Sequence, residues 1–404
     1  MTASRTVARW LLLCALSATL AGSASALFLT SLDWVTAYRE SHPWLTALLP
    51  LAGLLTGLAY HYVGRTSSQG TRLLLQEFHR PTAPVPLRMA PLVLLGTLAT
   101  HLTGGSAGRE GTAVQMGGTL ADQLARPLRM NTHQRQTLLL MGMAAGFAAV
   151  FGTPLAGAIF ALELALWRRA PWDCLPILVT AYAADWVCQS WGIAHTAYRI
   201  AHQPQFAPAT LVWIALAAVA FGLTARLFVA TVHGATLLYG RITYPPLRPL
   251  VGGIVLVGIF WLSGTTQYMG LGVPTIVESF DQHLSQYTFA IKLLLTSLTL
   301  AAGFKGGEAT PLFFVGATLG NALVWLLPLP MDLLAGLGFV AVFGAATHTP
   351  LACAVMGMEL FGFSHTGAVY FLLCSWLAHW VAGPHGVFGH REQFRAVPAD
   401  ADKI

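Results

Sequence analysis

The 404-residue sequence has little charge: Asp, Glu, Lys and Arg together make up 9% of it, while hydrophobic residues make up 55%. Soluble globular domains carry about 25% charged residues, so this composition excludes a soluble domain as the main body. Hydrophilic stretches long enough to form an additional soluble domain are also missing. We therefore expect a polytopic membrane protein embedded in a lipid bilayer.

Metal-binding and disulfide patterns are missing as well. The five cysteines lie in apolar stretches without CxxC spacing, which indicates buried free thiols. The 14 histidines are scattered and form no HExxH motif. The sequence therefore predicts neither a metal site nor a cofactor.

The net charge is +6, but the arginines are spread thinly over short loops. Arg5 and Arg9 precede the first apolar run, others cluster in the connection 126–135, and a third group lies after Phe388. An excess of Lys and Arg marks the cytoplasmic loops of membrane proteins. We therefore expect a cytoplasmic N-terminus and C-terminus, and a topology signal explains the charge better than a nucleic-acid partner does.

Apolar runs long enough to cross a membrane are few, because a spanning helix needs about 20 apolar residues. The runs that qualify are 9–32, 44–63, 136–167 and 208–231, the third of which we expect to split near Gly152. The remaining runs are short or broken by Gly and Pro: 90–103, 112–125, 289–303, 311–328 and 350–362. Non-helical backbone at membrane depth is tolerated where it is buried in protein or lines a water-filled cavity. The pattern predicts an all-α protein whose broken helices mark a transport pathway.

The most informative break is the glycine-rich stretch 104–118, which contains the pair Arg109–Glu110. A glycine-rich turn leading into a helix leaves free backbone N–H groups that attract anions. Glu110, when ionised, would compete with a bound anion for these N–H groups. The stretch therefore indicates an anion pathway with a titratable plug, although Glu110 could instead be neutralised by Arg109 or cap the following helix.

The two halves of the chain contain similar segments. Thr153-Pro154 leads to Glu163, and Thr349-Pro350 leads to Glu359, with the same offset of 196 residues in both cases (349 − 153 and 359 − 163). Gly117 and Gly316 begin a second pair of similar segments, and each follows a glycine-rich break. The pattern indicates a duplication, which in transporters places the substrate site where the broken helices of the two halves meet.

The Thr-Pro pairs at 153, 310 and 349 are typical of helix starts. We expect the Thr side chains to cap these helices within the membrane. Glu163 and Glu359 occupy equivalent positions in the two halves, and we expect them to bind backbone amides or a loop arginine such as Arg168 or Arg169.

The order of these motifs resembles the CLC family of chloride channels and anion/proton antiporters. The resemblance rests on Gly-Arg-Glu-Gly at 108–111, Gly-Gly-x-x-x-Pro at 306–311 and the Glu-ending helix at 153–164. It implies a homodimer in the bacterial inner membrane, with one pore in each subunit. It also implies a fold of tilted, broken helices: a transmembrane domain over 1–390, in inverted halves of roughly 30–205 and 206–390, then a short cytoplasmic tail, 391–404, without a regulatory domain.

Within this family the chain resembles the bacterial fluoride-exporting branch. Thr112 stands where chloride-selective members usually have Pro, Glu308 and Thr310 stand where those members carry an apolar pair, and Leu164 replaces an internal proton-transfer glutamate. Lys305 also suits that branch. Two departures, Thr71 in the first pore motif and Phe388 in place of the pore tyrosine, leave a chloride or nitrate channel, or a chloride/proton exchanger, as the alternative.

The resemblance and the residues together predict a fluoride/proton antiporter. Fluoride is small and strongly hydrated, so helix N-termini, Thr hydroxyls and a protonatable Glu suit it. Glu110 is the predicted gate; Glu308, 198 residues further on (308 − 110), is predicted to continue the proton route or to hydrogen-bond Thr310 or fluoride. Arg109 is expected chiefly to fix its loop. The predicted anion-binding residues are Gly70, Thr71, Gly108, Arg109, Gly111, Thr112, Gly307, Ala309, Thr310 and Phe388.

A membrane-embedded enzyme that uses Glu110 and Glu308 as an acid/base pair is the rival from a different class. No nucleophile–base pair and no metal-ligand spacing accompany these two carboxylates. We therefore expect transport rather than catalysis.

Overall fold

A computed structural model describes residues 3–167, 169–202, 207–362 and 365–390 of the chain. The described residues form helices, with one two-stranded hairpin at 385–390, so the all-α prediction is confirmed. The predicted tail 391–404 lies outside the described residues. All five cysteines are free thiols, as expected, and only Cys174 is not fully buried.

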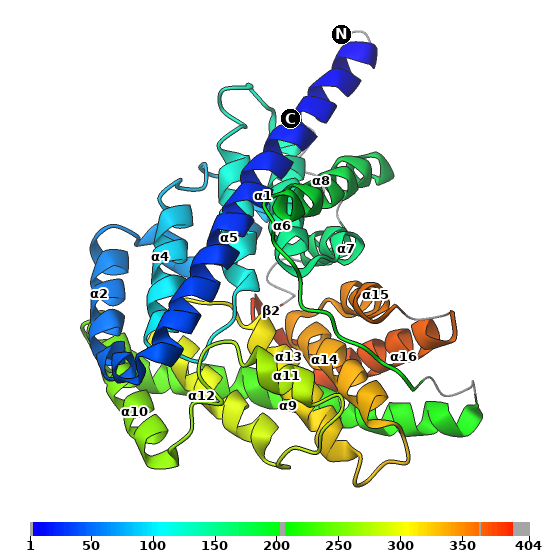
Figure 1. Cartoon of the computed structure of the whole chain (residues 1–404). Helices are drawn as coiled ribbons and strands as arrows, with labels where there is room; N and C mark the ends of the chain where they lie inside the picture. The colour runs from blue at the N-terminus through cyan, green and yellow to red at the C-terminus, as the bar shows by residue number, and fades with distance from the viewer. Residues whose placement is uncertain (1–2, 168, 203–206, 363–364, 391–404) are drawn as a thin grey trace.

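The helices fall into a first and a second group along the chain, coloured blue to green and green to red in Figure 1. The first group consists of α1 (Ala3–Ser41), η1 (Pro43–Leu48), α2 (Leu49–Tyr62), η2 (Thr66–Gln69), α3 (Thr71–His79), α4 (Met89–Leu102), α5 (Glu110–Asp122), α6 (Thr132–Phe151), α7 (Pro154–Leu164) and α8 (Pro171–Ser190). The second group consists of α9 (Pro208–Gly240), α10 (Leu247–Ser263), α11 (Val273–Glu278), α12 (Thr288–Ala302), α13 (Ala309–Leu323), α14 (Met331–Thr347), α15 (Pro350–Phe361), α16 (His365–Ala382) and the strands β1 (His385–Gly386) and β2 (Gly389–His390).

Helix lengths follow the predicted pattern of long and broken segments. In the described part of the chain, three segments are long and apolar enough to span a membrane: Thr6–Ser41, Pro43–Tyr62 and Pro208–Gly240. The short runs become the short helices α4, α5, α12, α13 and α15. The run 136–167 splits as expected, because Gly152 adopts a left-handed conformation with φ +72° that ends α6 just before α7 begins.

The two groups of helices are joined by contacts between repeat-related elements. Helix α2 packs against α10, and α7 packs against α15. At the centre, Gly108 and Gly307 form an antiparallel bridge in which each backbone N–H donates to the other residue's carbonyl, at 2.5 and 2.7 Å. A reciprocal bridge of this kind is what a local two-fold axis between the halves produces.

The bridge corrects the alignment of the two glycine-rich breaks. Gly108 and Gly307 are 199 residues apart (307 − 108), as are Gly117 and Gly316. The offset of 198 that would pair Glu110 with Glu308 is therefore wrong by one residue. Glu308 corresponds to Arg109, and the two carboxylates reach the centre from non-equivalent positions.

The helix starts at the Thr-Pro pairs are capped differently from the prediction. The side chains of Thr153 and Thr349 make no capping hydrogen bond to the helices that follow them. The Thr349 hydroxyl instead lies 2.6 Å from that of Thr347. Thr310 lies inside α13, whose N-cap is Glu308. Carboxylates from the opposite half do the capping at α7 and α15, so the Thr hydroxyls are not needed there.

Glu163 and Glu359 exchange these caps between the halves. Glu359 on α15 accepts hydrogen bonds from the N–H groups of Leu155 and Ala156 at the start of α7, at 3.0 and 2.8 Å. Glu163 on α7 accepts from Leu351 and Ala352 at the start of α15, at 3.2 and 2.8 Å. The prediction that these carboxylates bind backbone amides is confirmed. Each places negative charge at a positive helix end, which stabilises both helices.

Because the two caps are related by the repeat, Glu163→Gln and Glu359→Gln should destabilise the protein to a similar degree. Glutamine keeps one acceptor oxygen but leaves a second backbone amide unsatisfied, which costs about 1–2 kcal/mol of unfolding free energy. Thermal unfolding of the purified protein in detergent measures the loss. Asp281→Asn is the control, because Asp281 is exposed; if it lowers the stability equally, the cap assignment is wrong.

Candidate anion site

Three helices begin at one point near the centre of the fold. Helix α3 starts at Thr71, α5 at Glu110 and α13 at Ala309. Phe388 reaches the same point from the turn between β1 and β2, which the hydrogen bond from Val387 N–H to the Ala346 carbonyl ties to the end of α14. The first N–H groups of each helix have no partner within the helix and carry partial positive charge. The convergence therefore favours an anion.

The carboxylate of Glu110 occupies part of this positive centre. Its Oε2 atom accepts hydrogen bonds from the backbone N–H of Thr310 at 3.0 Å and of Arg109 at 3.2 Å. The Thr310 hydroxyl lies 2.6 Å from both carboxylate oxygens. Arg109 Nε lies 3.6 Å from Oε1, and the Glu110 residue is only 1% exposed. A carboxylate of the first half thus sits at the helix start of the second half.

A small cavity of about 10 Å³, called here the narrow cavity, lies beside Glu110. This volume is close to the least that admits one water-sized particle. Its lining residues are Thr71, Glu110, Gly111, Val114, Phe147, Phe160, Glu308, Ala309, Phe343 and Phe388. Six of the predicted site residues therefore surround one space with room for a monatomic ion.

Sequence reasoning missed the aromatic wall of the narrow cavity. Phe147 stacks on Phe160 with ring centroids 4.5 Å apart, and Phe343 lies 5.9 Å from Phe160. Phe147 and Phe343 are 196 residues apart (343 − 147), the offset of the Thr-Pro segments. Extending the repeat comparison upstream from those segments would have shown that the two phenylalanines are equivalent, but not that they line a cavity.

Thr71 lines the narrow cavity. Gly70 precedes it with φ +59°, a conformation that favours glycine and turns the chain into α3. The side-chain amide of Gln115 donates to Thr71 Oγ1 at 3.4 Å. Because this contact uses the hydroxyl oxygen as an acceptor, the hydroxyl hydrogen remains available to an anion.

The other predicted residues support the site without lining the narrow cavity. Gly108 and Gly307 form the central bridge, and Thr112 Oγ1 lies 2.7 Å from Thr97 Oγ1 on α4. The suggestion that Glu308 hydrogen-bonds Thr310 is wrong, because the Thr310 hydroxyl is turned to Glu110. Glu308 makes no side-chain cap at α13 either.

With this geometry in place, the comparison with known families decides the class of protein. The family model described as voltage gated chloride channel matches residues 52–383. The chain belongs to the CLC family.

Relatives within the CLC family include fluoride and chloride transport proteins. The chain is 47% identical to the chloride/fluoride channel protein of Pseudomonas syringae pv. tomato, over 98% of this chain and 90% of that one. It is 27% identical to an H(+)/Cl(−) exchange transporter of Cronobacter sakazakii, over 87% and 81% of the two chains. It superimposes on the crystal structure of a CLC-type fluoride/proton antiporter with a TM-score of 0.91 at 34% identity, covering 96% of this chain and 98% of that one.

A second, larger cavity adjoins the narrow one in this CLC protein. It has a volume of about 940 Å³ and shares Thr71, Glu308 and Phe388 with the narrow cavity. We call it the wide cavity. Glu308 therefore lies between the two spaces, whereas Glu110 lines the narrow cavity and not the wide one.

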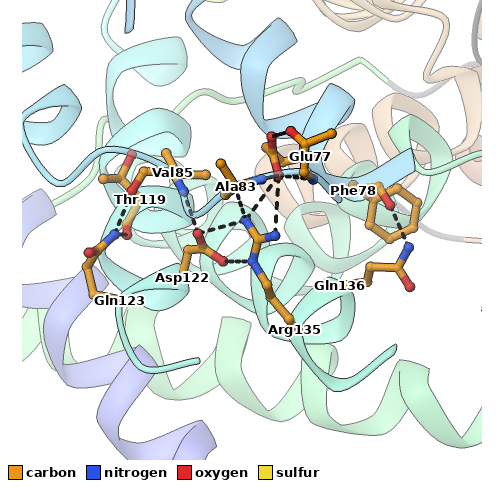
Figure 2. A network of polar contacts seen from close by, with 10 residues as sticks. Glu77, Phe78, Ala83, Val85, Thr119, Asp122, Gln123, Arg135 and Gln136 are labelled. Atoms are coloured by element: carbon orange, nitrogen blue, oxygen red, sulfur yellow. Dashed lines mark hydrogen bonds and ion pairs between the residues drawn. The ribbon is translucent and has the colours of Figure 1, made fainter. Parts of the chain in front are cut away.

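Arg135 of α6 holds together the far ends of the two first-half helices that begin at the anion site (Figure 2). Its guanidinium donates to Asp122 Oδ1 and Oδ2 at the end of α5, at 2.6 and 3.0 Å. It also donates to Glu77 Oε2 near the end of α3, at 3.3 Å, and to the Ala83 carbonyl at 2.7 Å. Thr71 and Glu110, at the opposite ends of these helices, are thereby fixed relative to each other.

Replacing Arg135 by methionine should lower the unfolding free energy by about 3 kcal/mol, because it leaves two carboxylates uncompensated. The Arg135 side chain is 13% exposed, and those of Asp122 and Glu77 are 0% and 8% exposed. Thermal unfolding in detergent tests this expectation. Arg126→Met, in the connection just before α6, is the matched control, since Arg126 is exposed and surface changes cost about 0.5 kcal/mol at most. Equal losses in the two variants would contradict the role of Arg135.

Proposed function

We propose that this CLC protein is a fluoride/proton antiporter that exports fluoride and uses Glu110 as its gate. The observation that carries the proposal is the position of the Glu110 carboxylate on the Thr310 N–H and hydroxyl, beside a cavity the size of one small ion. The similarity to a fluoride/proton antiporter and to a chloride/fluoride channel protein supports the same substrate.

The exchange follows from the chemistry of one carboxylate. Ionised Glu110 acts as an anion and fills the positive centre at the start of α13. Once protonated, it loses this electrostatic attraction, and an external anion can take its place. The proton that neutralised Glu110 and the anion that replaced it therefore move in alternation.

Fluoride suits the site better than a larger anion does. Thr71 and Thr310 supply hydroxyl donors and the helix starts supply N–H donors, which together replace part of a tightly held hydration shell. The Phe147, Phe160 and Phe343 rings limit the volume. Glu308, which lines both cavities, is placed to carry the proton between Glu110 and the wide cavity.

The bilayer orientation and the assembly are proposals as well. We infer that the protein is a homodimer in the bacterial inner membrane with one pore per subunit and with both termini in the cytoplasm. The arginine distribution supports the orientation, and the family supports the dimer. Glutaraldehyde cross-linking and size-exclusion chromatography with light scattering measure the assembly; a monomer under both would contradict it.

Flux through reconstituted protein tests the function directly. Liposomes containing the wild-type protein are loaded with fluoride or chloride, and anion efflux is recorded while external pH is followed. We expect fluoride efflux accompanied by proton entry, with chloride efflux much slower. Equal fluoride and chloride efflux without proton movement would overturn the proposal in favour of an anion channel, and chloride/proton exchange without fluoride preference would favour the other exchanger type.

A further inference from the structure

A third cavity, called here the far cavity, has a volume of about 600 Å³ and shares no lining residue with the narrow or the wide cavity. Tyr198, Arg199 and His202 line it from the connection between α8 and α9. Met331 and Asp332 line it from the start of α14. Its volume leaves room for water molecules, and the proton route through Glu308 to the wide cavity does not use it.

Helix α14 places the narrow cavity between the far cavity and the wide cavity. The helix starts at Met331, which lines the far cavity, and its Phe343 lines the narrow cavity. Near its end, the Ala346 carbonyl accepts a hydrogen bond from Val387, which lines the wide cavity. With a rise of 1.5 Å per residue, the helix is about 25 Å long. The far cavity therefore lies on the side of the anion site that is opposite to the wide cavity.

Tyr198 lies between the far cavity and the anion site. The centroid of its ring is 5.1 Å from that of Phe339 on α14, and Phe339 stacks on Phe313 with centroids 4.2 Å apart. Phe313 lies on α13, three residues after Thr310, which hydrogen-bonds Glu110. The three aromatic rings thus form a continuous line from the far cavity to the site of the proposed gate.

The hydroxyl of Tyr198 has no hydrogen-bond partner in the part of the chain that the structure describes. It lies close enough to Arg109 and Glu110 for the charges of both to act on it. A tyrosine hydroxyl withdrawn from water usually finds a partner, and it can both donate and accept a hydrogen bond. The Tyr198 hydroxyl is therefore an unused donor near Glu110.

The connection that carries Tyr198 is fixed on α14. Asp332 accepts a hydrogen bond from the backbone N–H of Ala201 at 2.7 Å. Ile200 is only 4% exposed and packs over Gly336, where an added Cβ would clash with the Ile200 side chain. A donor on such a fixed segment can hold a moving group in one defined position.

A gate that moves needs partners in both of its positions. At the start of α13, Glu110 accepts hydrogen bonds from the Thr310 N–H and hydroxyl and from the Arg109 N–H. An entering fluoride ion would take over these donors. The displaced carboxyl group then needs another donor, because an unpaired polar group away from water is unstable.

We propose that Tyr198 is the hydrogen-bond partner of Glu110 once the carboxyl group has left the start of α13 toward the far cavity. In that position the Tyr198 hydroxyl donates to one carboxylate oxygen. A hydronium ion in the far cavity transfers its proton to the other oxygen and becomes water. The far cavity thus supplies the proton, and Tyr198 positions Glu110 to receive it. The proposal rests on the proposed function, because it requires Glu110 to be the moving gate.

Tyr198→Phe tests the proposal, because it keeps the ring and removes only the hydroxyl. Fluoride efflux and proton entry are recorded together in liposomes at saturating fluoride. We expect the turnover rate of exchange to fall at least about tenfold, since a hydrogen bond to a carboxylate is lost. The number of protons per fluoride should stay at the wild-type value, because Glu110 still carries every proton. An unchanged turnover rate would overturn the proposal.

Two controls separate this role from packing. Tyr239→Phe removes the hydroxyl of another buried tyrosine, which lies outside all three cavities, and we expect wild-type turnover from it. Thermal unfolding of Tyr198→Phe in detergent should match the wild type, because the ring contacts remain. An equal loss of turnover in Tyr239→Phe, or a destabilised Tyr198→Phe, would assign the Tyr198 hydroxyl to packing and contradict the proposal.

A Glu110→Ala background shows which group the hydroxyl serves. This variant has no carboxyl group to hold, and we expect fluoride to cross it without protons. Adding Tyr198→Phe should then leave fluoride efflux unchanged. A further fall in efflux would mean that the hydroxyl contacts fluoride itself, and the assignment to Glu110 would be wrong.

Failure of this proposal is distinguishable from failure of the proposed function. If wild-type protein exchanges chloride for protons, the fluoride selectivity is wrong, but the same comparison tests Tyr198 with chloride. If wild-type protein exchanges fluoride for protons and Tyr198→Phe keeps its turnover rate, only the role of Tyr198 is wrong. If wild-type protein moves no protons, both proposals fall.

Discussion

Replacing Glu110 by glutamine is expected to reduce proton movement through the protein at least about 100-fold, to the background of empty liposomes. Glutamine keeps the shape of the glutamate side chain and can still accept a hydrogen bond from the Thr310 hydroxyl. It neither ionises nor carries a proton at neutral pH. It resembles the protonated gate, so fluoride should still bind and cross. Simultaneous recording of fluoride efflux and external pH in proteoliposomes measures both fluxes.

Glu163→Gln is the matched control for this experiment. Glu163 is also a buried carboxylate that accepts backbone N–H groups at a helix start, but it lies outside both cavities. We expect it to lower stability and to leave the ratio of protons to fluoride unchanged. If Glu110→Gln still exchanged protons at the wild-type ratio, Glu110 would be only a helix-capping residue.

Replacing Glu308 by glutamine should reduce proton movement by about tenfold while fluoride efflux falls less, so that more fluoride ions leave for each proton that enters. The physical reason is its position: Glu308 lines both cavities, and no other side chain in the described structure donates a hydrogen bond to it. A proton moving between Glu110 and the wide cavity would otherwise depend on water alone.

The double variant Glu110→Gln/Glu308→Gln should transfer protons at the same background rate as Glu110→Gln alone, because the first step is already lost. Fluoride binding to each detergent-solubilised variant, measured by calorimetry, checks that the site persists. An unchanged proton-to-fluoride ratio in Glu308→Gln would instead mean that Glu308 is only the N-cap residue of α13 and takes no part in proton transfer.

The sequence was sufficient to predict the class of fold and the elements around the site. Low charge, broken apolar runs and glycine-rich breaks follow directly from the demands of a membrane interior, and they place α4, α5, α12, α13 and α15 within a few residues of their observed bounds. The start of α7 after Gly152 was also predictable, because the local backbone geometry of glycine favours the end of a helix and that of proline favours the start of one.

Features that depend on contact between the halves could not be predicted. The repeat showed that Glu163 and Glu359 are equivalent, but not that each caps the other's helix. The sequence suggested Glu308 as the partner of the Thr310 hydroxyl, and only the structure shows that this hydroxyl contacts Glu110 from the other half. The Phe147 and Phe343 rings looked like any apolar residues, since a side chain's exposure to a cavity depends on the packing of distant helices.

The exchange of caps between Glu163 and Glu359, and of backbone hydrogen bonds between Gly108 and Gly307, has a consequence for the origin of the chain. Both exchanges are reciprocal. Glu359 caps the start of α7 while Glu163 caps the start of α15, and each of the two glycines donates its N–H to the carbonyl of the other. Such contacts are self-complementary, which is the condition for a closed pair of identical subunits. An ancestor half this length could have closed into a symmetric pair through the same contacts before gene fusion joined its two copies.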